Sequence, residues 1–341
     1  MAAAKAKLRQ QKVADTDSGL LRRAHLRKQV TRDKYAESWN SFLDYCVDHT
    51  LLPGRSSRFV AMHQLDCALE AFGEHLFLGG ASKYTFTCAL QNVNIVDPCW
   101  PTSARTNFPL TKAAKKGWGN LEPGASKDPC PFEEASWIAL DMVRRGLCYF
   151  AAAVMLSFDT YIRPGKLCEL VAGNVVPPPK GVHRKYDHWT LLLHPQESAV
   201  PSKVGQFNDS LVVGSHGREW ISDLLGRIYS VHPGDLDSQL FDFTLDRFEK
   251  EFKVSVSRLG VQKLQLSPHC LRHGGASHDY LFGIRSLSDV QARGCWASYE
   301  SVRRYAKHGR INRQLNLLTP EQQQTAKQSH LELPRILLKC F

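Results

Sequence analysis

The stretch LSPHCLRHGG, residues 266–275, is the most informative pattern in this chain. It places two histidines around one arginine, follows them with two glycines and contains no carboxylate. His269 and Arg272 are three residues apart, so a helix that starts near Pro268 presents both on one face. Metal sites and hydrolase triads normally need an acidic residue close by. A cation and a neutral proton carrier without a carboxylate suit a substrate that is itself an anion.

The length and composition fit a two-domain globular protein. The 341 residues are enough for two hydrophobic cores, and 43% hydrophobic with 23% charged residues is ordinary for such proteins. The sequence contains no run of about 18 apolar residues, so it predicts no membrane span. The N-terminal residues lack the apolar segment of a secretory signal.

The chain is strongly basic, with a formal net charge of +11 and a pI of about 9.2. Residues 1–35 alone hold ten lysines and arginines against three aspartates. We predict a basic N-terminal arm over residues 1–29 that suits a polyanion such as DNA. A solvated, partly disordered tail fits the same charge pattern equally well.

Ten cysteines are scattered singly, and no CxxC pair occurs. This spacing argues against a zinc ribbon and against a disulfide scaffold. Cys148 and several others lie inside apolar runs, which predicts reduced cysteines in an intracellular compartment: the nucleus of a eukaryote, or otherwise the cytoplasm. Cys270, between His269 and His273, lacks the ligand spacing of a zinc site, so we expect no metal there.

Apolar periodicity and turn residues predict a mainly α fold with a small antiparallel β-sheet (α+β). The predicted segments are a basic arm (1–29), a helical domain (30–120), a linker (121–133), a second domain (134–315) and a C-terminal tail (316–341). The tail ends in the apolar run LPRILLKCF. This run either docks on a neighbouring protomer or covers the core of its own chain.

Individual elements are expected at the following places. Four helices of the first domain are predicted over residues 35–52, 62–80, 82–96 and 108–121. The second domain is predicted to start with one long apolar helix over residues 133–161. Two β-like runs, 187–195 and 209–215, form a hairpin with a long tip. Later helices are predicted over residues 217–231, 244–260, 268–284 and 299–309.

Cationic and proton-carrying residues lie at element boundaries of the second domain. Arg163 follows a helix end in DTYIRPG, and Tyr305 comes nine residues after Trp296. Lys203 lies at the tip of the hairpin, with Lys185 as its competitor. Two arginines can hold the non-bridging oxygens of a phosphodiester, a tyrosine can attack its phosphorus, and a lysine can protonate the leaving alkoxide. Such a set stabilises a phosphorane electrostatically.

The order and spacing of these residues resemble the tyrosine recombinase (phage integrase) family. YIRPGKLCEL, residues 161–170, resembles the family's first arginine box. SPHCLRHGGASHDYLFG, residues 267–283, resembles its His-x-x-Arg box, with small residues that allow close helix packing. The nine-residue spacing from tryptophan to tyrosine is similar to the last box. The resemblance covers about residues 128–315, and residues 30–120 resemble the family's core-binding, DNA-binding domain.

The resemblance implies a role for each matching position of a catalytic domain over residues 134–315. The tyrosine would form a 3′-phosphotyrosyl bond that conserves the phosphodiester energy, so neither ATP, another cofactor nor a metal is implied. The roles carried over are phosphate binding for Arg163 and Arg272, protonation of the leaving 5′-oxygen for Lys203, general acid–base catalysis for His269, an indole hydrogen bond for Trp296, the nucleophile for Tyr305 and support from behind for His273.

Two positions depart from the family's pattern. Lys166 stands where many members carry a glutamate, and Glu169 follows three residues later. We place Lys166 beside the site, where it alters the support of the first arginine or adds a phosphate contact. Gly294 lies one residue earlier than the family's glycine, because Cys295 intervenes before the tryptophan.

The resemblance implies a DNA breaking-and-rejoining enzyme, a site-specific recombinase or integrase that acts on double-stranded DNA. It also implies a homotetramer on DNA, with a monomer as the alternative for the free protein. The basic arm and the N-terminal helical domain are atypical for the family, which favours a eukaryotic mobile element as the source. Two alternatives stay open. One is a catalytically inactive DNA-binding protein derived from a recombinase, and the other is a type IB topoisomerase-like enzyme that nicks and reseals DNA.

Overall fold

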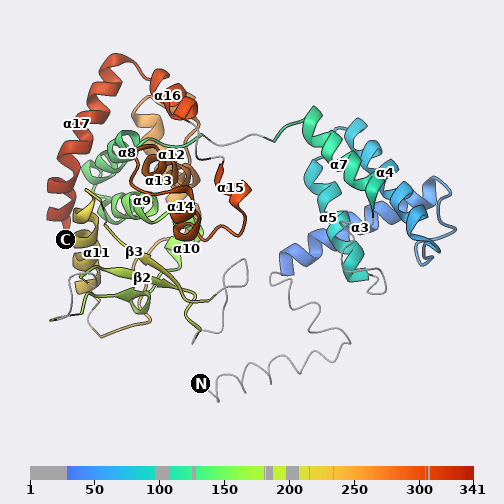
Figure 1. Cartoon of the computed structure of the whole chain (residues 1–341), viewed down its shortest axis with the longest axis horizontal. Coiled ribbons are helices and arrows are strands. Elements are labelled where there is room, and N and C mark those ends of the chain that lie inside the picture. The colour runs from blue at the N-terminus through green and yellow to red at the C-terminus, as the bar shows by residue number, and fades with distance from the viewer. Residues whose placement is uncertain are drawn as a thin grey trace. The chain divides into compact units, whose positions relative to one another are not determined.

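The computed structural model of the chain describes residues 29–96, 108–124, 128–179, 181, 187–196, 207–214, 216–232, 234–303, 305 and 308–341. The chain divides into two compact units, Met1–Ala125 (unit 1) and Ser126–Phe341 (unit 2). The described residues form helices and a small antiparallel sheet, which confirms the predicted mainly α fold (Figure 1). The predicted arm, residues 1–29, lies outside the described residues except for its last residue. None of the described helices is both long and apolar enough to cross a membrane.

The described part of unit 1 is built from helices at the four places that the sequence predicts. They are α3 (Gln29–Asp48), α4 (Met62–Leu78), α5 (Lys83–Val96) and α7 (Pro109–Leu121). α3 packs on α5 and α4 packs on α7, so that their apolar faces enclose one core. Large aromatic side chains fill this core, each at most 4% exposed: Phe42, Phe72, Phe86 and Trp118.

The start of α7 is stabilised by a buried carboxylate from α4. Asp66 is 1% exposed and accepts hydrogen bonds from the main-chain N–H groups of Leu110 and Thr111 at 3.0 and 2.9 Å. The Thr111 hydroxyl donates to the same carboxylate at 2.7 Å. The first N–H groups of a helix have no partner within the helix, and its dipole favours negative charge there. Asp66 therefore caps α7 from a different helix and joins the two.

Unit 2 begins with two buried helices, α8 (Phe132–Arg144) and α9 (Cys148–Thr160). The sequence predicts a single helix over residues 133–161, and this prediction is wrong. The chain turns at Gly146, whose φ of 76° lies in the left-handed region that glycine adopts without strain. Residues 150–160 are all buried, so α9 runs through the core of the unit.

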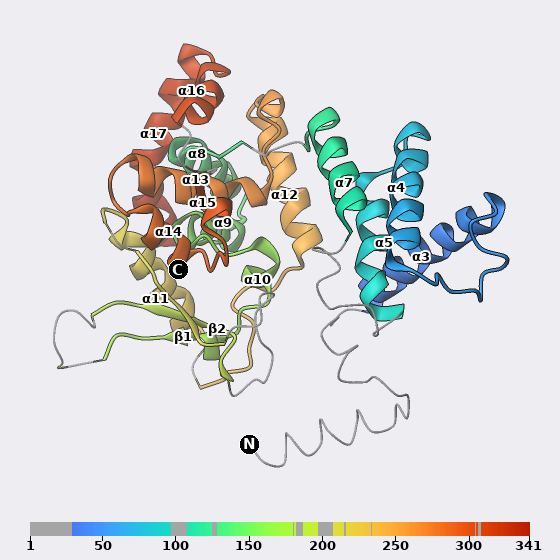
Figure 2. The same cartoon turned by 45° about the vertical axis from the view of Figure 1, so that its right-hand side comes forward.

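In the described residues of unit 2, the sheet contains three antiparallel strands in the order β1 (Val175–Val176), β2 (Thr190–Leu193) and β3 (Asp209–Val212) (Figure 2). Leu191 pairs with Leu211 in the β2–β3 register, and both side chains are buried. β2 and β3 are the strands of the predicted hairpin. β1 is not predicted, because two residues are too few to show an alternation of apolar and polar side chains.

The later helices of unit 2 follow most of the predicted segments. They are α10 (Pro164–Cys168), α11 (Glu219–Ser230), α12 (Leu245–Arg258), α13 (Pro268–Leu281), α14 (Leu287–Arg293), α15 (Tyr299–Arg303) and α16 (His308–Asn316). The helix predicted over residues 299–309 is shorter than expected, because α15 ends at Arg303. α14 is not predicted, although Ser286 and Asp289 form a capping box at its start.

The C-terminal segment packs on the core of unit 2. Helix α17 (Pro320–Leu337) lies against α8, and a short 3-10 turn (Leu338–Cys340) follows it (Figure 1). Leu333 and Leu337 are 0% exposed and belong to the same core as α8 and α9. Of the two expectations for the apolar end of the tail, this packing matches the one in which it covers its own core.

Candidate active site

Arg163 lies where the buried helix α9 gives way to the short helix α10. It is the N-cap residue of α10, which starts with Pro164, a residue favoured at the first helical position. Two residues earlier, Tyr161 ends α9 in the left-handed conformation, with a φ of 54°. Because α9 is buried up to its last residue, this turn fixes the place at which the half-buried Arg163 leaves the core.

Lys166 lies on α10, three residues after Arg163. Its ammonium group is 3.9 Å from the carboxylate of Glu169, whose side chain is 70% exposed. Ion pairs of this kind at the surface contribute little to stability. Lys203 and its competitor Lys185 both lie outside the described residues, so the hairpin lysine stays a prediction.

Helix α13 carries the motif PHCLRHGG, residues 268–275. It starts with Pro268, and its first two turns hold His269, Arg272 and His273. Arg272 is only 5% exposed, whereas His273 is half-buried and His269 is exposed. On the helix face that these residues are expected to share, Arg272 therefore lies in the interior of unit 2 and His269 lies at the surface.

The two glycines at the end of this motif allow α13 to approach other backbone closely. A Cβ atom on Gly274 would lie 1.9 Å from the carbonyl oxygen of Cys130, and one on Gly275 would lie 1.9 Å from that of Phe158. No real side chain tolerates such distances, so glycine is required at both positions. The close packing expected from these small residues is confirmed, and it seats Arg272 against the end of α9.

The structure brings five of the predicted site residues together in one chain of contacts. The guanidinium of Arg272 lies 4.1 Å from the ring centroid of Trp296. The rings of Trp296 and Tyr305 are 4.8 Å apart, and those of Tyr305 and His273 are 5.1 Å apart. His273 is in turn 5.0 Å from His269. A cation, an indole, a phenol and two imidazoles thus meet from three separate segments.

Arg272 is oriented by main-chain carbonyl groups. One terminal nitrogen donates to the carbonyl of Tyr161, and the other donates to the carbonyl of Gly294 at 2.5 Å. Burial, followed by the positive charge of Arg163, lowers the pKa of Arg272 to about 10, although the nearby Tyr305 and Cys295 oppose this shift. The two arginines therefore lie close enough to repel each other, which a bound anion would relieve.

Tyr305 is buried, and the chain makes a left-handed turn at Cys295, just before Trp296. The tyrosine is 4% exposed and belongs to a small cluster with Tyr161, Val290 and Val302. Cys295 takes a φ of 50°, in the left-handed region that favours glycine. The departure from the family's glycine thus changes the residue type at this turn, while its backbone conformation is one that a glycine adopts easily.

Sequence reasoning missed a group of buried charges behind these residues. Asp159 and Asp279 are each 0% exposed and share the guanidinium of Arg218, which is 2% exposed. The signal in the sequence was an aspartate at the end of the apolar run AAAVMLSFD, where a buried position is expected. Its partners lie 55 or more residues away along the chain, so the pattern alone does not identify them.

No protein-family model matches the chain, and no curated protein matches it. Among solved structures, the chain is similar to recombinases. The XerA recombinase is 17% identical with a TM-score of 0.39, over 83% of this chain and 98% of that chain. The Tn1549 transposon integrase (residues 82–397) in complex with circular intermediate DNA is 14% identical with a TM-score of 0.47, over 70% and 80%.

A third structure gives a similar result. The XerH site-specific recombinase bound to its difH substrate is 13% identical with a TM-score of 0.40, over 74% of this chain and 77% of that chain. These are distant likenesses of fold, and none of them assigns a role to a residue of this chain.

Proposed function

We propose that this chain is a metal-independent tyrosine recombinase, a DNA strand transferase that acts through a 3′-phosphotyrosyl intermediate. The observation that carries the proposal is the meeting of Arg272 with Tyr305, Trp296 and His273 within reach of the charge of Arg163. Two neighbouring cations next to a phenol suit one anionic substrate, and a phosphodiester supplies the two oxygens that two guanidinium groups bind.

In the proposed reaction, Arg163 and Arg272 bind the non-bridging oxygens of the scissile phosphate. The hydroxyl of Tyr305 attacks the phosphorus, the bond to the 5′-oxygen breaks, and a 3′-phosphotyrosyl bond forms. His269 accepts the phenol proton as the general base, and Lys203 donates a proton to the leaving 5′-oxygen. One phosphodiester is exchanged for another, so the step is balanced without a nucleotide cofactor.

The remaining site residues support these groups in the proposal. Trp296 donates its indole N–H to the phosphate and stacks on Arg272, while His273 lies between His269 and the tyrosine. Lys166 adds positive charge at the surface of α10. Residues 30–120 would act as a DNA-binding domain and residues 134–315 as the catalytic domain.

Double-stranded DNA is the proposed partner, since the net charge of +11 favours a polyanion and predicts binding that weakens steeply with salt. The proposed assembly on DNA is a homotetramer, with the monomer as the alternative for the free protein. The proposed location is the nucleus in a eukaryote and the cytoplasm otherwise. A mobile element is the proposed source.

The test is covalent capture on a pool of nicked DNA duplexes with a randomised central region. After denaturation, the wild-type chain should carry labelled DNA, and Tyr305→Phe should lower this adduct by at least about 100-fold, since no other group replaces the nucleophile. The matched control is Tyr299→Phe, because Tyr299 is 50% exposed on the neighbouring helix α15 and should keep full adduct formation.

Two outcomes favour the alternatives. Tight, salt-dependent binding without any adduct would leave an inactive DNA-binding protein derived from a recombinase. An adduct together with relaxation of supercoiled plasmids of arbitrary sequence would favour a type IB topoisomerase-like enzyme. An adduct that survives Tyr305→Phe would overturn the assignment of the nucleophile.

A further inference from the structure

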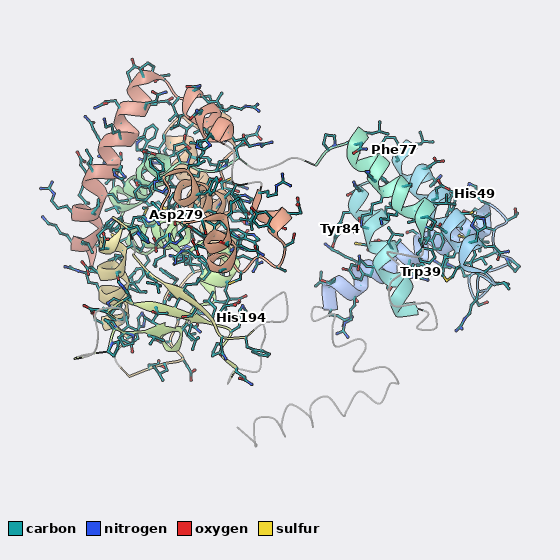
Figure 3. All side chains as sticks on the ribbon, in the orientation of Figure 1. Trp39, His49, Phe77, Tyr84, His194 and Asp279 are labelled. Atoms are coloured by element: carbon teal, nitrogen blue, oxygen red, sulfur yellow. The ribbon has the colours of Figure 1, made fainter. Side chains whose placement is uncertain are left out.

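Five charged residues form a connected group in the interior of unit 2, which we call the buried ion network: Asp159, Arg218, Asp279, Arg285 and Arg293. Arg218 is its centre. The Nε of Arg218 donates to Asp159 at 2.8 Å, and its two terminal nitrogens donate to the two carboxylate oxygens of Asp279 at 2.8 and 3.1 Å. Figure 3 shows Asp279 among the side chains of the helices of unit 2.

The carboxylate of Asp279 stays ionised despite its burial. Burial alone would raise its pKa, but hydrogen bonds from His278 and Arg218 and the charge of Arg218 outweigh it and hold the pKa well below the ordinary range. Burial would also lower the pKa of Arg218, but the two carboxylates outweigh it and raise the pKa. Buried ions are costly unless they are paired and hydrogen-bonded, so each member depends on the others.

The first connection between this network and the candidate site is Tyr161. Its hydroxyl donates to Asp279, while its main-chain carbonyl accepts a hydrogen bond from Arg272. Its φ of 54° is unfavourable for a residue with a side chain, so this conformation must be held by surrounding contacts. The network therefore anchors the side chain of the residue whose carbonyl orients Arg272.

The second connection is Arg293, at the end of α14. It donates to the main-chain carbonyl of Asp159 at 3.1 and 2.8 Å and to the Asp159 carboxylate at 3.2 Å. The next residue is Gly294, whose carbonyl is the other acceptor for Arg272. Tyr161, which supplies one acceptor for Arg272, is thus bound to Asp279, and Arg293, the neighbour of the other acceptor, is bound to Asp159.

We propose that Asp279, Arg218 and Asp159 are positioning residues for the proposed recombinase chemistry. They do not touch DNA. They hold the Tyr161 and Gly294 carbonyl groups so that the Arg272 guanidinium faces the phosphate before DNA arrives. This inference rests on the proposed function, because it assigns the network a task in that reaction.

A second ion cluster of unit 2, centred on one buried carboxylate, provides a control. Asp141 on α8 is 6% exposed and pairs with the Ser255 hydroxyl at 2.8 Å, Arg258 at 3.2 Å and Arg145 at 3.9 Å. Its partners belong to α12 and to the end of α8, so neutralising it removes a buried charge without touching the groups around Arg272. A purely structural role predicts equal consequences for both clusters.

The test compares Asp279→Asn, Tyr161→Phe and Asp141→Asn in the full chain on the nicked-duplex pool. Tyr161→Phe keeps every charge of the network and removes only the connection to Asp279. We expect Asp279→Asn and Tyr161→Phe to lower the adduct rate at saturating DNA about 10- to 100-fold, while DNA affinity changes less than about 3-fold, because orientation rather than ground-state binding is lost. Asp141→Asn should lower the melting temperature and leave the saturated rate unchanged.

A measurement without catalysis separates this proposal from the proposed function. The Nε–H NMR signal of Arg272, assigned with Arg272→Lys, should show a rigid side chain in the DNA-free wild type and a mobile one in Tyr161→Phe. If the wild type forms no adduct but Arg272 becomes mobile in Tyr161→Phe, the proposed chemistry is wrong and the positioning role is kept. An Arg272 signal unaltered by Tyr161→Phe, or a rate loss in Asp279→Asn no larger than in Asp141→Asn, would overturn the positioning role.

Discussion

Unit 1 and unit 2 bury different kinds of side chain. The core of unit 1 is aromatic, with Phe42 and Phe72 rings 5.4 Å apart, and its buried carboxylate, Asp66, binds the start of a helix. The interior of unit 2 holds, beside an apolar core, an arginine and two aspartates that are at most 2% exposed. Burial of apolar side chains stabilises a fold. Burial of ions removes them from water, and this desolvation often costs as much free energy as their attraction supplies.

The two units differ in whether buried charges fix the direction of main-chain carbonyl groups. In unit 1 a helix start needs one acceptor, and a single carboxylate supplies it. In unit 2 the ends of α9 and α14 must present two carbonyl groups to Arg272, and apolar contacts do not fix the direction of a carbonyl group. Directional hydrogen bonds to buried charges do fix it, which gives a reason for the cost of their burial.

The largest effect is expected where α13 meets backbone. Gly275→Ala places a methyl group against the Phe158 carbonyl oxygen, so we expect a loss of at least about 3 kcal/mol in unfolding free energy. Gly309→Ala, in open space on α16, should change it by less than about 1 kcal/mol. Urea unfolding followed by circular dichroism measures both, and equal values would show that α13 has room to move.

A smaller, pH-dependent effect is expected for the buried carboxyl group of α8. Glu134 is 2% exposed, and burial, followed by the charge of Glu133, raises its pKa to about 8. Between its unfolded pKa of about 4.3 and 8, the folded state keeps a proton that the unfolded state has released, so stability falls as pH rises through this interval.

Glu134→Gln removes this ionisation. We expect it to match the wild type at pH 5 and to be more stable by about 2 kcal/mol at pH 6.5, because each pH unit in this interval costs the wild type about 1.4 kcal/mol. Urea unfolding at pH 5, 6.5 and 8 measures the difference. Glu133→Gln makes the same change of charge at the half-buried neighbouring position and should keep most of the wild-type slope. A slope that survives Glu134→Gln would assign the pH dependence to another group.

The smallest effect concerns unit 1. Asp66→Ala removes the acceptor at the start of α7, and the loss of a helix cap costs about 1 to 2 kcal/mol. Hydrogen exchange over residues 109–121 should become faster, and exchange in unit 2 should stay the same. Asp44→Ala, which breaks an exposed pair with Arg55, should leave the exchange of α7 unaltered. Faster exchange in both variants would show that unit 1 responds to any lost charge.

Local patterns were sufficient for much of the fold. The helices of unit 1 are predicted because each has an apolar face and a turn after it, and β2 and β3 are predicted because two short β-like runs lie on either side of a long tip. The break between α8 and α9 is missed, since the apolar run continues on both sides of Gly146 and only its left-handed φ turns the chain. A two-residue strand such as β1 carries no periodic signal.

Part of the candidate site, too, is predicted from the sequence and part is seen only in the structure. Arg163, Arg272, Trp296 and Tyr305 are predicted from residue type, order and spacing, and the proposed phosphodiester reaction is the reason for choosing these residue types. Residue types and their order along the chain are thus enough to propose which groups form the candidate site. How Arg272 is held depends on the folded chain, since Asp159, Arg218 and Asp279 lie about 60 residues apart along the sequence and meet only when α9, the start of α11 and α13 pack together. Spacing encodes neighbours along one element, whereas the partner of a buried charge depends on which elements close around it.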